Sequence, residues 1–169
     1  KEPIWSKIYK LTFLILFMKN SFKKGLGFGI TSGVITTLGL IIGLYAGTAS
    51  RIAILGGIIT IAIADSFSDS LGIHLSEEAV GKKTKPIWES MGFTFLFKLI
   101  FAGIFVLPFL FFGLESAVIL SVVWGFLVLG IFSFFIAKQN KTSIIGAILE
   151  HLGIAVLVVA ITYYVGTII

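Results

Sequence analysis

The chain has 169 residues, of which 57% are hydrophobic and 12% charged, and its formal net charge is +5. A mean hydropathy of +1.10 is too high for a soluble domain of this size and indicates a protein of the lipid bilayer. The absence of cysteine excludes disulfides, thiolate metal sites and cysteine nucleophiles. A basic excess in a membrane protein is typical of cytoplasmic loops, so we expect no nucleic-acid partner.

Residues 1–26 are expected to form an N-terminal amphipathic segment. Apolar side chains recur there in steps of three and four, and lysines flank them at both ends. This pattern is typical of a helix that lies in the cytoplasmic interface of the membrane. Burial of the same helix against the rest of the protein is the alternative, because its middle is apolar on every face. A signal peptide is not expected, since no small-residue cleavage site follows.

Residues 27–169 contain five apolar stretches that approach the roughly 20 residues needed to cross a bilayer as a helix. The second stretch has to continue through two aspartates, because the uncharged run after Arg51 is too short to cross alone. Pro108 is expected to kink the third. The sequence therefore predicts an all-α, polytopic membrane protein with five transmembrane helices after an interfacial amphipathic helix. The expected spans are 27–47, 52–76, 92–113, 116–137 and 143–168.

Nearly all basic residues outside the expected spans lie in segments on one side of the membrane. Eleven lysines precede the first span or lie in the loops after spans two and four, whereas Arg51 stands alone in the loops of the other side. The positive-inside rule then places the N-terminus in the cytoplasm and the C-terminus outside. We expect a multi-pass protein of a prokaryotic cell membrane, because the chain is compact.

Several ionisable residues lie inside the expected spans. Each costs about 2.5 to 3.5 kcal/mol on insertion scales, so such residues usually face the bundle interior and serve a function. Asp65 and Asp69 are four residues apart and share one face of the second helix. Lys98 in span three, and Glu150 and His151 in span five, lie at a similar depth.

These residues predict a cation site. Two neighbouring carboxylates repel, and one binds a proton unless a cation lies between them. The three carboxylates with Lys98 carry a charge of −2, which one divalent cation or two protons would neutralise. Oxygen ligands with one imidazole suit manganese or ferrous iron better than copper. We therefore predict that divalent metal and protons compete for Asp65, Asp69, Glu150 and His151. In the alternative, Lys98 is the charge partner of Glu150 or Asp65 in a structural ion pair.

Weaker candidates lie on the first two spans. Ser32 and Thr36 offer hydroxyls to an ion path, although hydroxyls in membrane helices often bond their own backbone. At the cytoplasmic end of span two, a metal entrance or a solvated surface is formed by His74, Glu77 and Glu78. Glycines recur four apart in span one, where they permit close packing within the protomer or a homodimer seam.

Residues 63–76, IADSFSDSLGIHLS, resemble the second-helix signature of the vacuolar iron transporter family, approximately Ile-Ala-Asp-Ala-Leu-Ser-Met-Ala-x-Gly-Glu-Tyr-Leu-Ser. Residues 32–37 are similar to the family's first-helix pattern, Asp-Gly-Leu-Val-Thr-Thr. Residues 160–166 are similar to its glycine-punctuated last helix. The likeness covers spans one, two and five, about half of the chain.

The resemblance implies a homodimeric exporter of ferrous iron, manganese or a related divalent ion from the cytoplasm, in exchange for protons. The metal is then the transported substrate, with no permanently bound cofactor. Ser32, Asp69 and Ile73 stand where the family has aspartate, methionine and glutamate. The cytoplasmic metal-binding domain that some members insert between spans two and three is absent.

The sequence thus predicts a transporter rather than an enzyme. One alternative is an accessory or scaffolding membrane protein whose buried charges are structural. The other is an intramembrane metal-dependent hydrolase, which is disfavoured because the chain has two histidines and no His-Glu-x-x-His motif.

Overall fold

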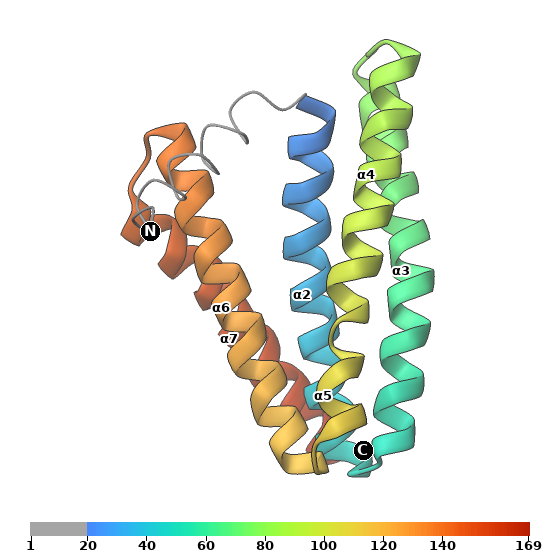
Figure 1. The fold of residues 1–169 in the computed structure, drawn as a ribbon, viewed down its shortest axis with the longest axis vertical. Helices are drawn as coiled ribbons and strands as arrows, with labels where there is room; N and C mark the ends of the chain where they lie inside the picture. Colours follow the sequence, from blue (N-terminus) through green and yellow to red (C-terminus); the bar gives the residue numbers. More distant parts are fainter. Residues whose placement is uncertain (1–19) are drawn as a thin grey trace, which may run out of the picture.

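The computed structural model describes residues 20–169, and every regular element in that range is a helix (Figure 1). Five of its segments are long and apolar enough to cross a membrane, with α4 and α5 together forming the third. The expectation of an all-α chain with five such spans is confirmed. The helices are α2 Asn20–Thr48, α3 Arg51–Ala79, α4 Thr84–Gly103, α5 Val106–Phe111, α6 Leu114–Asn140 and α7 Ile144–Ile168.

The helices extend beyond the apolar runs that indicate them. Helix α2 includes residues 20–26, which the sequence pattern had assigned to the N-terminal segment. Helix α4 begins at Thr84, eight residues before the expected start of span three. Polar residues at a helix end can lie beyond the hydrocarbon, so a hydropathy window misses them. The interfacial helix stays a prediction, because residues 1–19 lie outside the described part of the chain.

The third span is broken between α4 and α5. Proline has no N–H, so Pro108 cannot donate to the carbonyl of Ile104, four residues earlier. The N–H of Leu107 donates to that carbonyl instead, at 3.0 Å, in a tighter turn. The kink expected from Pro108 is confirmed.

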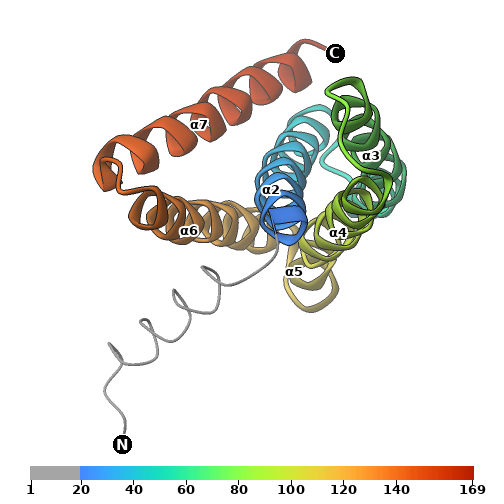
Figure 2. The same cartoon turned by 90° about the horizontal axis from the view of Figure 1, so that it is seen from above.

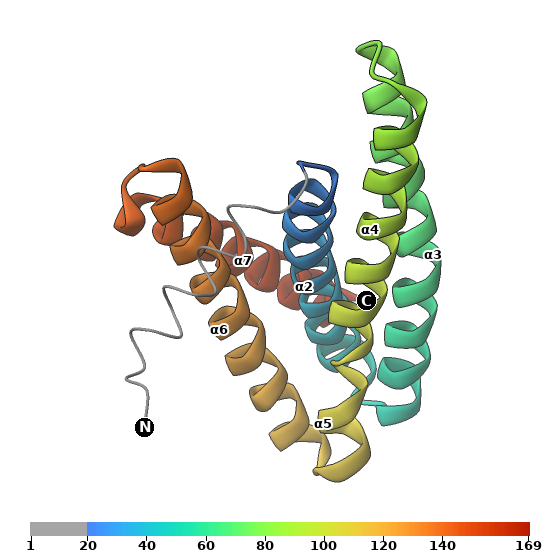
Figure 3. The same cartoon turned by 45° about the horizontal axis from the view of Figure 1, so that its top comes forward.

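Helix α2 lies in the middle of the bundle and packs against α3, α4, α6 and α7 (Figure 2). The antiparallel pair α3–α4 lies on one side of it and the pair α6–α7 on the other. In Figures 1 and 3, α6 diverges from α2 toward the top of the view. Many large apolar side chains on the outer faces are exposed, as expected of surfaces that contact lipid.

Glycines set the packing of α2. Its first half presents Gly25, Gly29 and Gly33 to α4, where a Cβ atom on Gly29 would lie 2.8 Å from Phe97 Cβ. Its second half presents Gly39, Gly43 and Gly47 to α7. The glycine stripe therefore packs within the protomer, which was one of the two interpretations of its spacing. The homodimer stays a prediction.

The two ends of the bundle differ in charge. One end of the bundle contains the start of α2, the α3–α4 loop and the α6–α7 loop (Figure 1). At the other end, Arg51 donates a hydrogen bond to the carbonyl of Phe112. We call the first the lysine end; its assignment to the cytoplasm stays a prediction. Its described basic residues are Lys23, Lys24, Lys82, Lys83, Lys85, Lys138 and Lys141.

Candidate ion-binding site

A cluster of polar side chains, one of them fully buried, lies between α2, α3 and α4. At its centre is Lys98 of α4, whose side chain is 1% exposed. The close approach of α2 and α4 at Gly33 makes this burial possible, because a Cβ atom there would lie 3.2 Å from the carbonyl oxygen of Lys98. The long side chain crosses the contact and brings its ammonium to α3.

Three oxygen atoms surround the Lys98 ammonium. Nζ lies 2.5 Å from Asp65 Oδ2, donates to Asp69 Oδ2 and donates to Ser32 Oγ at 2.8 Å. The Ser32 hydroxyl in turn donates to Asp69 Oδ2 at 2.6 Å. Asp65 was one of the two partners that the sequence offered for Lys98. The second contact, with Asp69, makes Lys98 a bridge between the aspartates.

The two aspartates are bound differently. Asp69 Oδ2 accepts from both Lys98 and Ser32, whereas Asp65 Oδ2 contacts Lys98 alone among the described residues. The Asp65 side chain is 26% exposed and lines a groove of about 510 Å³ together with Thr60 and Ser68. Asp65 therefore joins the cluster to an opening on the surface of α3.

The cluster carries surplus negative charge. Two carboxylates face one ammonium, which leaves a net charge of −1 at membrane depth. Asp65 is equidistant from the two ends of α3, so the charge lies near the middle of the span. Carboxylate and hydroxyl oxygens are ligands for hard cations. With Lys98 in place they hold an ammonium; without it, Asp65, Asp69 and Ser32 could hold a metal ion.

Thr36 is not part of the cluster. Its hydroxyl donates to the backbone carbonyl of Ser32 at 2.8 Å, one turn earlier in the same helix. Of the two hydroxyls considered for an ion path, Ser32 reaches the charged residues and Thr36 satisfies its own helix.

Glu150 and His151 lie elsewhere. Helix α7 packs mainly on α2 and α6. Glu150 of α7 is exposed. His151 Nδ1 lies 2.8 Å from Ser133 Oγ of α6. Within residues 20–169, no group of three or more histidine and acidic residues is placed to hold a metal ion. The four predicted ligands therefore do not form one site within a protomer, although they share a depth.

The three residues predicted to form a metal entrance do not lie together. His74 Nε2 lies 3.9 Å from Glu78 Oε2, and its ring packs edge-on against Trp88 at 4.8 Å between centroids. Glu77 is buried instead and binds Lys24 and Lys82. No sequence pattern indicated the pairing of Glu77 with Lys24, which lies 53 residues away.

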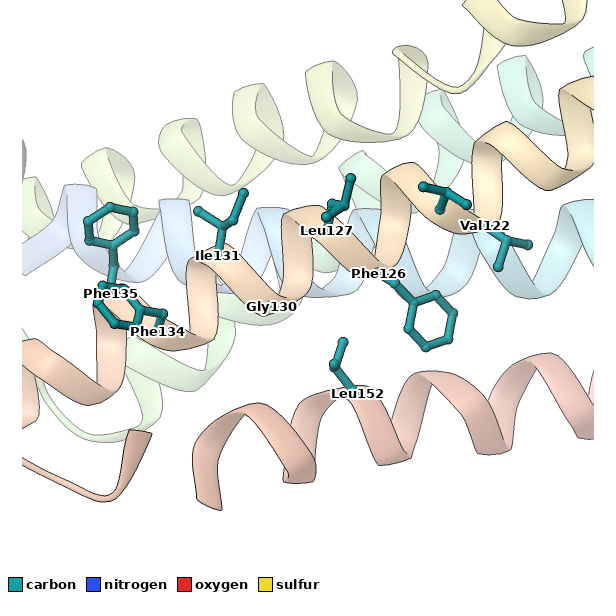
Figure 4. Close-up of a pocket in the computed structure, with 9 residues that line it drawn as sticks. Val122, Phe126, Leu127, Gly130, Ile131, Phe134, Phe135 and Leu152 are labelled. Atoms are coloured by element: carbon teal, nitrogen blue, oxygen red, sulfur yellow. The ribbon is translucent and has the colours of Figure 1, made fainter. Parts of the chain in front are cut away.

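An apolar pocket lies along α6, beside α7. Its volume is about 850 Å³, and Figure 4 shows Phe126 and Leu152 pointing into the space between the two helices. Its lining residues are aliphatic or aromatic, apart from one glycine. This pocket offers no ligand for an ion.

Comparisons of the chain with protein-family models, with curated proteins and with solved structures find no match. The resemblance of residues 32–37, 63–76 and 160–166 to the vacuolar iron transporter signatures therefore stays a prediction.

Proposed function

We propose that this chain is a membrane transporter of divalent cations of the iron(II) and manganese(II) class, which exports the metal from the cytoplasm in exchange for protons. Asp65 and Asp69 are its principal ligands. The observation that carries the proposal is the convergence of both aspartates on a buried ammonium inside the bundle. Aspartates facing lipid would have been incompatible with it.

The ratio of charges supports an exchange site. A structural ion pair needs one carboxylate for each ammonium, but Lys98 faces two. An uncompensated charge in the membrane is costly, so its presence favours a functional role. A cation that displaces the ammonium meets both carboxylates, whose charge of −2 one divalent ion neutralises.

The accessibility of Asp65 supports a route to this site. A cation in the groove beside Thr60 and Ser68 reaches Asp65 first. Within the described residues Asp65 Oδ2 is held by Lys98 alone, so fewer contacts are lost when a new ligand binds this carboxylate. Asp69, which Ser32 and Lys98 hold, becomes the second ligand when the ammonium moves.

The proposal does not use Glu150 and His151 as ligands of the same ion. Their place on α7 would require that helix to move, or a second protomer to supply them. The family resemblance bears on the same positions, because residues 32, 65 and 69 belong to its signatures; Asp65 matches the family, whereas Ser32, Asp69 and Ile73 replace its aspartate, methionine and glutamate. Ser32, Asp65 and Asp69 are the residues that meet Lys98 in this structure.

Transport into proteoliposomes tests the proposal. The native chain is compared with Asp65→Asn and Asp69→Asn for uptake of Mn²⁺ and Fe²⁺ under an imposed pH gradient. We expect metal flux coupled to proton counterflow, lost in both variants. Glu115→Gln is the matched control, because Glu115 is an exposed acid in the first turn of α6, and it should transport normally. No flux of either metal by the native chain would refute the proposal.

The second candidate is an accessory or scaffolding membrane protein. It is favoured by the hydrogen bonds of Asp69, because Ser32 and Lys98 already donate to this carboxylate. In that case Asp65→Asn combined with Asp69→Asn would leave function in the cell intact, provided that the variant accumulates in the membrane.

A further inference from the structure

A second polar cavity lies at the lysine end, away from the Lys98 cluster. Its volume is about 690 Å³, and it is formed by the start of α2, the end of α3 and the start of α4. Four lysines and two glutamates line it, which gives a formal charge of +2. They are Lys23, Lys24, Lys82, Lys85, Glu77 and Glu89.

Glu77 gathers two of these lysines. Its Oε1 atom lies 2.6 Å from Lys24 Nζ and 2.9 Å from Lys82 Nζ. One carboxylate with two ammonium groups leaves a charge of +1 at this point. Each ammonium has three N–H donors and spends one on Glu77. The remaining donors are available to a further anion, because both lysine side chains are partly exposed, at 45% and 37%.

Glu77 and Ser90 form the buried floor beneath these lysines. Ser90 is 1% exposed and lies beside the Glu77 carboxylate. Burial raises the pKa of Glu77, but hydrogen bonds from Lys24, Lys82 and the Ser90 hydroxyl outweigh it and hold that pKa down to about 2. Glu77 is therefore an anion at neutral pH and both lysines stay charged. A ligand in the cavity therefore has to accept hydrogen bonds from lysine.

We propose that this cavity binds the headgroup of an anionic phospholipid. The phosphate accepts from Lys24, Lys82 and Lys85, which line the cavity. The position fits, because the cavity lies at the polar ends of three spanning helices, at the depth of headgroups. This inference does not depend on the proposed transport function, since the cavity shares no residue with the Lys98 cluster.

Inorganic phosphate has the same acceptor oxygens, so the experiment has to separate the two sources. The purified full chain in neutral detergent is titrated with short-chain phosphatidylglycerol, with phosphatidylcholine or with inorganic phosphate, while thermal unfolding is followed. We expect a saturable rise in Tm with phosphatidylglycerol. Phosphatidylcholine, which has no net charge, should give none. An equal rise with inorganic phosphate would overturn the lipid assignment.

Two neighbouring lysines provide the matched variants. Lys85 lines the cavity, whereas Lys83 is exposed in the same segment and does not. Neither substitution touches the ion pairs of Glu77, so both variants should fold. Lys85→Gln should weaken phosphatidylglycerol binding about fivefold, and Lys83→Gln should leave it unchanged. Equal weakening in both variants would reduce the effect to general surface charge and overturn the proposal.

The proposal also requires a saturable response of the native chain to phosphatidylglycerol, and the absence of that response would contradict it.

Discussion

On one side of α2, four polar side chains from three helices contact one another around Lys98. On the other side, the hydroxyls of Ser121 and Ser133 donate to carbonyls of their own helix, α6. His151 of α7 contacts Ser133 of α6, and an apolar pocket lies beside the same two helices. Both sides pack against the same central helix.

The difference follows from which side chains lie at the helix contacts, since glycines bring both α4 and α7 close to α2. Gly29 and Gly33 let α2 contact the backbone of α4, so that a lysine from one helix can reach aspartates on another. Helix α6 leans away from α2 toward the lysine end (Figure 3), and its polar groups are satisfied locally. We therefore expect substitutions in the α2–α3–α4 half to affect stability more than equivalent substitutions in the α6–α7 half.

The largest expected effect is that of Lys98→Met. Loss of the ammonium leaves two carboxylates without their counter-charge, which should lower the free energy of unfolding by about 3 to 5 kcal/mol. The measurement is unfolding by SDS in mixed micelles. Addition of Asp65→Asn and Asp69→Asn to the variant should recover most of the loss. If the triple variant is no more stable than Lys98→Met, charge is not the cause.

Gly29→Ala should come next, at about 1 to 3 kcal/mol of lost stability. The new Cβ would lie 2.8 Å from Phe97 Cβ and 2.9 Å from the backbone nitrogen of Lys98, so α2 and α4 have to separate. Gly153→Ala on α7 is the control, because nothing lies within 4 Å of its added Cβ. Equal unfolding free energies for the two variants would argue against glycine-dependent packing.

Ser32→Ala should lower stability by about 1 to 2 kcal/mol, because Asp69 loses one of its two donors. Ser121→Ala is the matched control in the other half. Ser121 is fully buried, whereas Ser32 is partly buried, and the Ser121 hydroxyl bonds the carbonyl of Ala117 in its own helix. The same SDS titration compares the two, and a larger loss in Ser121→Ala would reverse the proposed contrast.

The smallest effect is expected for Ser133→Ala. It removes the α6 partner of His151 Nδ1, and hydrogen bonds between membrane helices contribute about 0.6 kcal/mol on average. A double-mutant cycle with His151→Gln measures this coupling. A coupling as large as that between Lys98 and Asp69 would mean that the two halves do not differ in polar packing.

Depth in the membrane could be predicted from the sequence, but direction around the bundle could not. The charge-free runs placed Asp65, Asp69 and Lys98 at one level, and Pro108 marked the break in its span. The same argument placed Glu150 at that level, yet Glu150 faces outward from α7. Position along a helix follows from counting residues, whereas its neighbours depend on which helices pack together.

The ion pair of Glu77 with Lys24 could not be predicted from the sequence for a related reason. Its partner Lys24 lies at the start of α2, and the contact depends on how α2 packs against the α3–α4 pair. Glycine spacing indicated that some helix approaches α2 closely, but not that α4 meets its first half and α7 its second. Periodicity shows that a contact face exists without showing which helix occupies it.

The bridge between Lys98 and the two aspartates also bears on how the chain enters the membrane during synthesis. Helix α3 leaves the ribosome first, and each of its carboxylates disfavours partition from the translocon into lipid by about 2.5 to 3.5 kcal/mol. Helix α4 follows after a loop of residues 80–83 and brings Lys98 to the same depth. The two helices are then expected to partition together as one hairpin, with the ion pairs formed before lipid surrounds them.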